Sequence, residues 1–231
     1  KRSRNHTELL LKYLNYPIKI KKNKNHDLIE IEGLKQFKSF KYNVPGDISS
    51  ASFFIILTLL SNKSKMLIKN ININTSRIGI IKILNKMNAN IKVINKRNYK
   101  GENIGDIKIK STKHFKSINC PEVLNSSAID EFLLIFLVAA KSKGISSFKS
   151  LEELNKKESP RLEIAIKFLK MIGIKVLRKN DNVKIIGNPE LRLKGKYHIK
   201  NFQKDHRVFM MSVIAALTFG GEWKINDKDS I

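Results

Sequence analysis

Two kinds of helix alternate along this chain, and their order constrains the fold more than any other feature of the sequence. In the first kind, a hydroxyl residue and an arginine precede an amphipathic run with apolar residues at helical spacing. Each run then passes into a short stretch with the two-residue period of a β-strand. The three copies start at Arg4, Arg77 and Arg161.

In the second kind, an aspartate precedes a run that is apolar on almost every side, so these helices should be buried. The copies begin at Asp47, Asp130 and Asp205. The two kinds alternate strictly, and the step from an aspartate to the next arginine is 30 residues in one case and 31 in the other. Such regular spacing predicts a repeated structural unit.

Strand-like segments lie between the helices and complete the predicted unit. Residues 65–73 and 145–151 precede the arginine helices, whereas residues 28–33, 105–111 and 182–187 follow them with clean alternation. The unit is therefore β-α-β-α-β-β. We predict a mixed α/β fold in which the helices are buried and half-exposed sheets lie outside.

The formal net charge of +25 raises the possibility of a basic nucleic-acid-binding module, which stays open as an alternative. Only eight of the 45 basic residues are arginines, and the lysines are scattered along the chain. Nucleic-acid binders concentrate their charge and interleave arginines or aromatic residues. A lysine-rich solvated surface without a specific nucleic-acid partner is the favoured interpretation.

Cys120 is the single cysteine, so the chain has neither a disulfide framework nor a cysteine metal cluster. The longest apolar runs, residues 53–60 and 132–140, are too short to cross a bilayer. The opening residues also lack an apolar signal segment. We expect a cytoplasmic protein without a membrane partner.

The start of the third arginine helix carries the most charge. A lysine and a glutamate, Lys157 and Glu158, precede Ser159, Pro160 and Arg161, and the other two copies lack this pair. Ser159 is a good N-cap, and Pro160 suits the first helical position. Helix starts present free N–H groups to anions, so the segment can bind an anion and also supply a carboxylate. The simpler interpretation is a capped surface helix.

Five motifs in order resemble a known family, the 3-phosphoshikimate 1-carboxyvinyltransferases, also called 5-enolpyruvylshikimate-3-phosphate synthases, in their bacterial form. The motifs are Ser-Arg-Asn-His-Thr-Glu from Ser3, Val-Pro-Gly-Asp-Ile-Ser-Ser-Ala-Ser-Phe-Phe from Val44, Ala-Ile-Asp-Glu from Ala128, Leu-Glu-Glu-Leu from Leu151 with Lys-Glu-Ser-Pro-Arg-Leu from Lys157, and Asp-His-Arg from Asp205. The resemblance covers the whole chain.

The resemblance implies a protein of two domains, each built of three β-α-β-α-β-β units, of which this chain is about the last half. Residues 1–44 would end the first domain, and residues 45–231 would form the second domain without its C-terminal end. Because the first domain also supplies phosphate ligands in this family, we expect the chain to be inactive alone.

The implied reaction transfers the enolpyruvyl group of phosphoenolpyruvate to the 5-hydroxyl of shikimate 3-phosphate and releases phosphate. The implied partners are these two small molecules, and the protein is expected to be a monomer. Neither a metal nor an organic cofactor is implied. The sister enzyme that transfers enolpyruvyl to UDP-N-acetylglucosamine is a second alternative, because it shares the fold.

Matching the motifs residue by residue implies two catalytic carboxylates. Asp130 matches the group that accepts a proton from the substrate hydroxyl, and its structural alternative is the N-cap of a buried helix. Glu158 matches the group that exchanges a proton with the methylene carbon of phosphoenolpyruvate.

The same matching implies four substrate-binding cations. Lys157 would bridge the two substrates, Arg161 and Arg207 would bind phosphoenolpyruvate, and Arg4 would face shikimate 3-phosphate. Asp205 and His206 are expected to brace a helix start. Capping and domain closure are the roles expected of Asp47, Ser49, Ser50 and Arg77.

Overall fold

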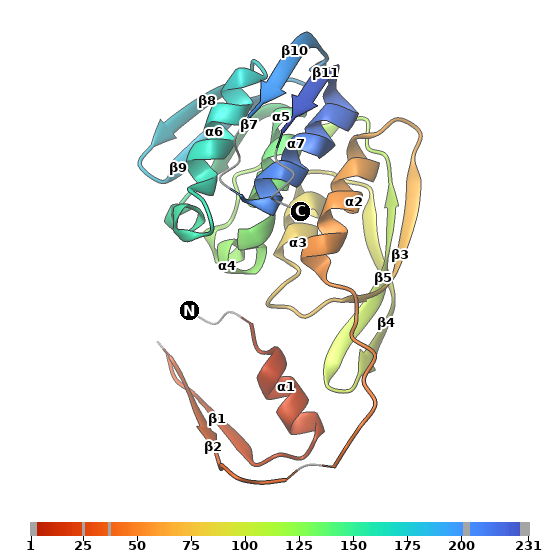
Figure 1. The fold of residues 1–231 in the computed structure, drawn as a ribbon, viewed down its shortest axis with the longest axis vertical. Coiled ribbons are helices and arrows are strands. Elements are labelled where there is room, and N and C mark those ends of the chain that lie inside the picture. Colours follow the sequence, from red (N-terminus) through yellow and green to blue (C-terminus); the bar gives the residue numbers. More distant parts are fainter. Residues whose placement is uncertain (1–3, 25, 37, 201–203, 227–231) are drawn as a thin grey trace.

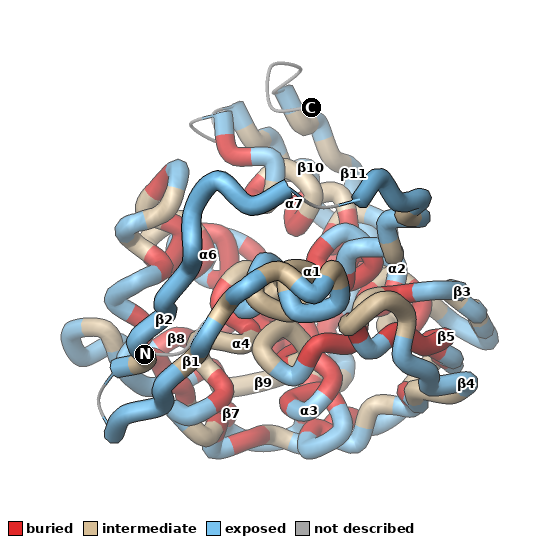
Figure 2. Tube along the Cα trace, turned by 90° about the horizontal axis from the view of Figure 1, so that it is seen from below, coloured by how far each residue is buried: buried red, intermediate tan, exposed pale blue. Residues whose placement is uncertain are grey.

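The computed structural model describes residues 4–24, 26–36, 38–200 and 204–226, which leaves Ser3 of the first motif outside the described residues. A small part, lowest in Figure 1, contains helix α1 (His6–Tyr13) and the antiparallel hairpin of β1 (Ile18–Lys22) and β2 (Asp27–Ile31). An extended segment joins it to the main body. Helix α1 has no buried residue, and Figure 2 shows it passing in front of the buried centre.

The helices of the main body follow the predicted alternation. The aspartate helices are α2 (Ile48–Leu60), α5 (Phe132–Ala140) and α7 (His206–Phe219). The arginine helices are α3 (Gly79–Lys86) and α6 (Arg161–Met171). Short helical turns link them, namely η1 (Glu122–Leu124), α4 (Asn125–Ala128), η2 (Ile129–Glu131) and η3 (Glu152–Lys156).

The strands also follow the predicted order. One strand follows each aspartate helix, namely β3 (Lys65–Asn72), β7 (Ser142–Phe148) and β11 (Gly220–Ile225). Three strands follow each arginine helix of the main body, namely β4 (Ile91–Tyr99), β5 (Glu102–Lys110) and β6 (Phe115–Lys116), and then β8 (Lys175–Lys179), β9 (Asn182–Gly187) and β10 (Leu193–Ile199). The repeat order is confirmed, although the sequence patterns did not predict β6 and β10.

Strand pairing repeats as well. The sheets have the orders β3-β5-β4, β6-β7-β9-β8 and β10-β11. The strand after an aspartate helix pairs in parallel with the strand before that helix, as in β6–β7 and β10–β11. For α2 the equivalent pairing is a single parallel bridge between Gly46 and Ile71. The described residues therefore contain two copies of one unit and the first three elements of a third, β10, α7 and β11.

The core lies where the aspartate helices pack together inside the sheets (Figure 1). Every residue of α5 is buried, and the rings of Phe132, Phe136 and Phe148 pack with centroids 5.0–6.0 Å apart. Full burial of one such side chain contributes about 1.5–3 kcal/mol. The aspartate helices α2 and α7 are less completely buried than predicted, since Phe54 and Leu217 are exposed.

The turns before α5 correct two predictions. Residues Glu122–Ala140 form one helical run that is long and apolar enough to span a membrane, but 67% of its most apolar window is buried inside the molecule. Burial in the core accounts for that composition. The N-cap of α5 is Glu131, without a side-chain cap, so the alternative of Asp130 as a cap is wrong. Since η2 runs directly into α5, Asp130 is left to face other groups.

Candidate active site

A polar cleft of about 490 Å³ lies where the starts of several helices converge, and it contains most of the predicted site residues. It is lined by Arg4, His6, Asp47, Arg77, Asp130, Lys157, Glu158 and Arg207. Each of these residues lies in the first turn of a helix, or within a few residues before one. Because helix starts present free N–H groups and a positive dipole end, the cleft is suited to anions.

Asp130 lies at the centre of a cluster of cations. Its carboxylate accepts a hydrogen bond from Arg4. Lys157 Nζ and Arg161 Nη1 each lie 3.6 Å from Oδ1, and Arg77 Nη1 lies 4.0 Å from Oδ2. Arg207 Nη1 donates to the backbone carbonyl of Asp130 at 3.3 Å.

Two opposing effects act on the pKa of Asp130. Burial raises it, but the positive charges of Arg207, Lys157, Arg4 and Arg77 together outweigh burial and hold the pKa below its usual value. Asp130 is therefore ionised at neutral pH in the absence of a bound anion. An anion that draws these cations away would make Asp130 a stronger base.

The repeat explains how these groups come together. The arginine that starts each arginine helix of the main body bridges two successive repeat aspartates. Arg77 bonds to Asp47 at 2.9 Å and faces Asp130, whereas Arg161 bonds to Asp205 at 2.8 Å and faces Asp130. Asp130 is the aspartate that both bridges share.

The helix start at residues 157–162 differs from its prediction. The N-cap of α6 is Pro160, and the helix begins at Arg161. The predictions of Ser159 as the N-cap and Pro160 as the first helical residue are therefore wrong. Asn155 Oδ1 instead accepts from the N–H groups of Leu162 and Glu163 at 3.1 and 3.3 Å. Ser159 is buried and donates to Asp205 at 2.7 Å, because that buried carboxylate needs donors.

Arg161 lies beneath the cleft and is not among the residues that line it. Its side chain is 1% exposed, and it donates to Asp205 through Nε at 2.8 Å and Nη2 at 3.2 Å. Nη2 also lies 2.6 Å from the carboxylate of Glu158, which is 57% exposed in the cleft. Arg161 thus joins a fully buried carboxylate to an accessible one.

Asp205 has the bracing role that the sequence predicts. It is the N-cap of α7, and its Oδ1 accepts from the Arg207 N–H at 3.0 Å. Burial raises the pKa of Asp205. The hydrogen bonds from Arg161 and Ser159, the charge of Arg161 and the Arg207 N–H together outweigh burial and hold this pKa below its usual value. Asp47 likewise caps α2 by accepting from the Ser50 N–H at 2.9 Å.

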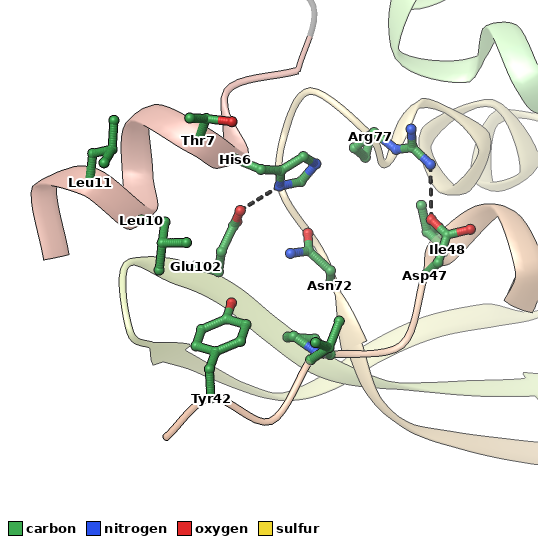
Figure 3. Close-up of a pocket in the computed structure, with 12 residues that line it drawn as sticks. His6, Thr7, Leu10, Leu11, Tyr42, Asp47, Ile48, Asn72, Arg77 and Glu102 are labelled. Carbon is green, nitrogen blue, oxygen red and sulfur yellow. Dashed lines mark hydrogen bonds and ion pairs between the residues drawn. The ribbon is translucent and has the colours of Figure 1, made fainter. Parts of the chain in front are cut away.

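Three residues in the cleft were not predicted as site residues, namely His6, Asp47 and Arg77. A signal for two of them existed in the regular step from Asp47 to Arg77, which equals the step from Asp130 to Arg161 within one residue. His6 carries no such signal. It bonds to the buried Glu102 and lies beside a second, more apolar cavity of about 390 Å³ between α1 and β5, where Leu10 and Tyr42 also point inward (Figure 3).

No group of three or more His, Cys, Asp or Glu side chains among the described residues is arranged to hold a metal ion. Cys120 is buried, and burial raises the pKa of its thiol to about 11, so it is not an activated nucleophile.

Comparison with known proteins decides the family. The model of EPSP synthase (3-phosphoshikimate 1-carboxyvinyltransferase) matches residues 1–231. This chain belongs to the EPSP synthase family. The 3-phosphoshikimate 1-carboxyvinyltransferases of Petrotoga mobilis and Ruthia magnifica are 37% and 36% identical to it, over 94% and 99% of this chain. The chain spans about half the length of these relatives, 48% and 51% respectively.

Solved structures agree with the EPSP synthase assignment. An EPSP synthase from Acinetobacter baumannii has a TM-score of 0.88 at 30% identity, over all of this chain and 51% of that protein. The enolpyruvyl transferase NikO from Streptomyces tendae has a TM-score of 0.63 at 13% identity, over 94% of this chain and 47% of that one, and shows the shared fold alone. The predicted mixed α/β, enolpyruvyl transferase-like fold is confirmed, and the family match disfavours the sister enzyme.

Proposed function

We propose that the protein carrying this chain transfers the enolpyruvyl group of phosphoenolpyruvate to the 5-hydroxyl of shikimate 3-phosphate, with release of phosphate. The observation that carries the proposal is the cleft in which Asp130 is surrounded by Arg4, Lys157, Arg161 and Arg207. Both substrates carry phosphate and carboxylate groups, which such cations and helix starts bind. The family match supports the same reaction.

In this proposal, Asp130 accepts the proton of the 5-hydroxyl. The anions of the substrates attract Arg4, Lys157 and Arg207, and the pKa of Asp130 rises toward that of a useful base as these charges turn away. The 5-oxygen then attacks the enol carbon of phosphoenolpyruvate while its methylene gains a proton. In the elimination, the methyl group of the tetrahedral intermediate loses a proton and the bond to phosphate breaks, while Asp130 gives its proton to the leaving phosphate.

Glu158 is the proposed partner of the methylene carbon, because its carboxylate is exposed in the cleft beside Lys157. The salt bridge to Arg161 sets its position. Lys157 and Arg207 line the cleft and are proposed as direct ligands, as is Arg4. Binding of phosphoenolpyruvate by Arg161 stays a prediction, since its guanidinium lies under Glu158 and is held by Asp205.

We further propose that residues 1–44 end a first domain and residues 45–231 belong to a second. The extended segment that joins α1 and its hairpin to the main body supports this division (Figure 1). The proposed enzyme is a cytoplasmic monomer that needs neither a metal nor an organic cofactor. The isolated chain is proposed to be inactive, because it spans half the length of its relatives.

The test is phosphate release by the full-length protein with phosphoenolpyruvate and one of two acceptors. We expect release with shikimate 3-phosphate and none with UDP-N-acetylglucosamine. Release with the UDP-sugar alone, or with neither acceptor, refutes the proposal. The same assay on residues 1–231 tests the predicted inactivity of the isolated chain.

A further inference from the structure

Arg77 differs from the other cations of the cleft in how it is held. Its Nη2 donates to Asp47 Oδ1 at 2.9 Å and to Ser49 Oγ at 2.7 Å, while Nη1 lies 4.0 Å from Asp130 Oδ2. The side chain is 12% exposed, whereas that of Arg4 is 53% exposed. Figure 3 shows the Arg77 guanidinium directed at Asp47 at the start of α2.

Ser49 connects Arg77 to a second buried carboxylate. Ser49 is 1% exposed, and its hydroxyl donates to Glu131 Oε1. A hydroxyl has one proton, so a Ser49 that donates to Glu131 presents its lone pairs to Arg77. Glu131 is 3% exposed and directly follows Asp130 in η2. The contacts therefore form a closed path from Glu131 through Ser49 and Arg77 to Asp130.

We propose that Glu131 and Ser49 anchor Arg77 so that it remains beside Asp130 throughout the reaction, which makes Arg77 a positioning residue. The inference rests on the proposed function. Anionic substrates compete with Asp130 for the accessible cations Arg4, Lys157 and Arg207. Arg77 is tied to the protein by Ser49 and Asp47 and keeps one fixed positive charge near the base. That charge orients the Asp130 carboxylate toward the hydroxyl that it deprotonates.

The pH dependence of the anchor provides a readout that a merely structural role would not give. Burial raises the pKa of Glu131 to about 6, whereas Ser49, Arg207 and Arg77 lower it and Asp130 raises it. Below that pH Glu131 is protonated and holds the Ser49 hydroxyl less firmly. Glutamine at this position accepts from Ser49 at every pH, so Glu131→Gln retains the hydrogen bond without the titration.

The experiment measures kcat and KM of the full-length protein with phosphoenolpyruvate and shikimate 3-phosphate. Arg77→Met is expected to lower kcat roughly 100-fold and Ser49→Ala about 10-fold, with both KM values within about twofold of wild type, since small misplacements of a reacting group have such effects. The matched control is Ser61→Ala, at the other end of α2, where the hydroxyl bonds only to Leu57 O among the described contacts. It should leave both constants unchanged.

A raised KM with unchanged kcat in Arg77→Met would make Arg77 a substrate ligand and overturn the proposal, as would unchanged constants. If Ser49→Ala fails to fold, Glu131→Gln decides. We expect the acid limb of the wild-type kcat profile near pH 6 to be absent in Glu131→Gln, and an identical limb overturns the anchor. A wild-type protein without turnover refutes the proposed function instead, so the two failures are distinguishable.

Discussion

Removal of the Asp205 carboxylate should be among the most destabilising single changes in this protein. In Asp205→Ala, Arg161 loses two hydrogen bonds, of 2.8 and 3.2 Å, although its side chain is 1% exposed. Ser159 loses its acceptor, and α7 loses its N-cap. Arg161 and Ser159 both donate to this one carboxylate, so its removal leaves a buried cation and a buried hydroxyl poorly paired.

Breaking a buried ion pair on one side costs about 3–5 kcal/mol, and loss of a cap costs about 1 kcal/mol. Glu158 and Asp130 stay within 2.6 and 3.6 Å of Arg161 and compensate part of its charge. We therefore expect a loss of about 3 kcal/mol, which corresponds to roughly 6–12 °C in Tm for a chain of this size.

The assay is urea or thermal denaturation followed by circular dichroism at pH 7. Glu163→Ala is the control, because its salt bridge with Arg178 is on the surface and should contribute less than about 1 kcal/mol. In the double variant Arg161→Met with Asp205→Ala, the loss should be clearly smaller than the sum of the two single losses. A loss below about 1 kcal/mol in Asp205→Ala, or strict additivity in the double variant, would refute this reasoning.

Three other experiments give separate tests. The wild-type protein should lose roughly 2 kcal/mol of stability between about pH 4.5 and 6, because the Glu131 carboxyl has a raised folded-state pKa, stabilises the fold when protonated and loses this contribution as pH rises. Glu131→Gln should abolish this pH-dependent loss. A denaturation profile of the variant that is the same as that of wild type across this range would contradict the prediction. The Cys120 thiol, with a pKa of about 11, should stay unmodified by a maleimide at pH 7.5 until denaturant is added, whereas fast labelling of the native protein would show that the site is open. Gly187→Ala should lower the free energy of unfolding by at least about 2 kcal/mol in a urea titration, since a Cβ there lies 2.2 Å from Ser142 O and 2.5 Å from Ala139 O. Gly195→Ala, whose added Cβ has a nearest contact of 3.4 Å, should lower it far less.

Much of the fold follows from the alternation of two helix types, because hydrophobic periodicity records which faces are buried. The β9 strand has the predicted bounds, α6 begins one residue later than predicted, and the order of strands around each helix is confirmed. Strand β10 was not predicted because Lys194 and Lys196 interrupt the apolar pattern of a strand with a single parallel neighbour. Charged residues tolerate such partly exposed positions.

The site was harder to derive than the fold, for a physical reason. A helix cap depends on which side chain lies nearest in space. For this reason Asn155, and not Ser159, accepts the hydrogen bonds of the free N–H groups at the start of α6. Burial likewise depends on long-range packing, and nothing local distinguishes the buried Arg161 from the exposed Arg4. The five motifs identified the groups that meet at the cleft, but only the structure shows that Asp130 is shared by two arginine bridges.

The most direct test of this account is the turnover number of Asp130→Asn in the full-length protein, measured with saturating phosphoenolpyruvate and shikimate 3-phosphate. Asparagine retains the shape of the side chain but removes the proton acceptor at the centre of the cation cluster. We predict that kcat falls by at least about 100-fold while the denaturation midpoint stays close to that of wild type. A wild-type kcat in Asp130→Asn would contradict the assignment of this cleft as the centre where the proton is transferred.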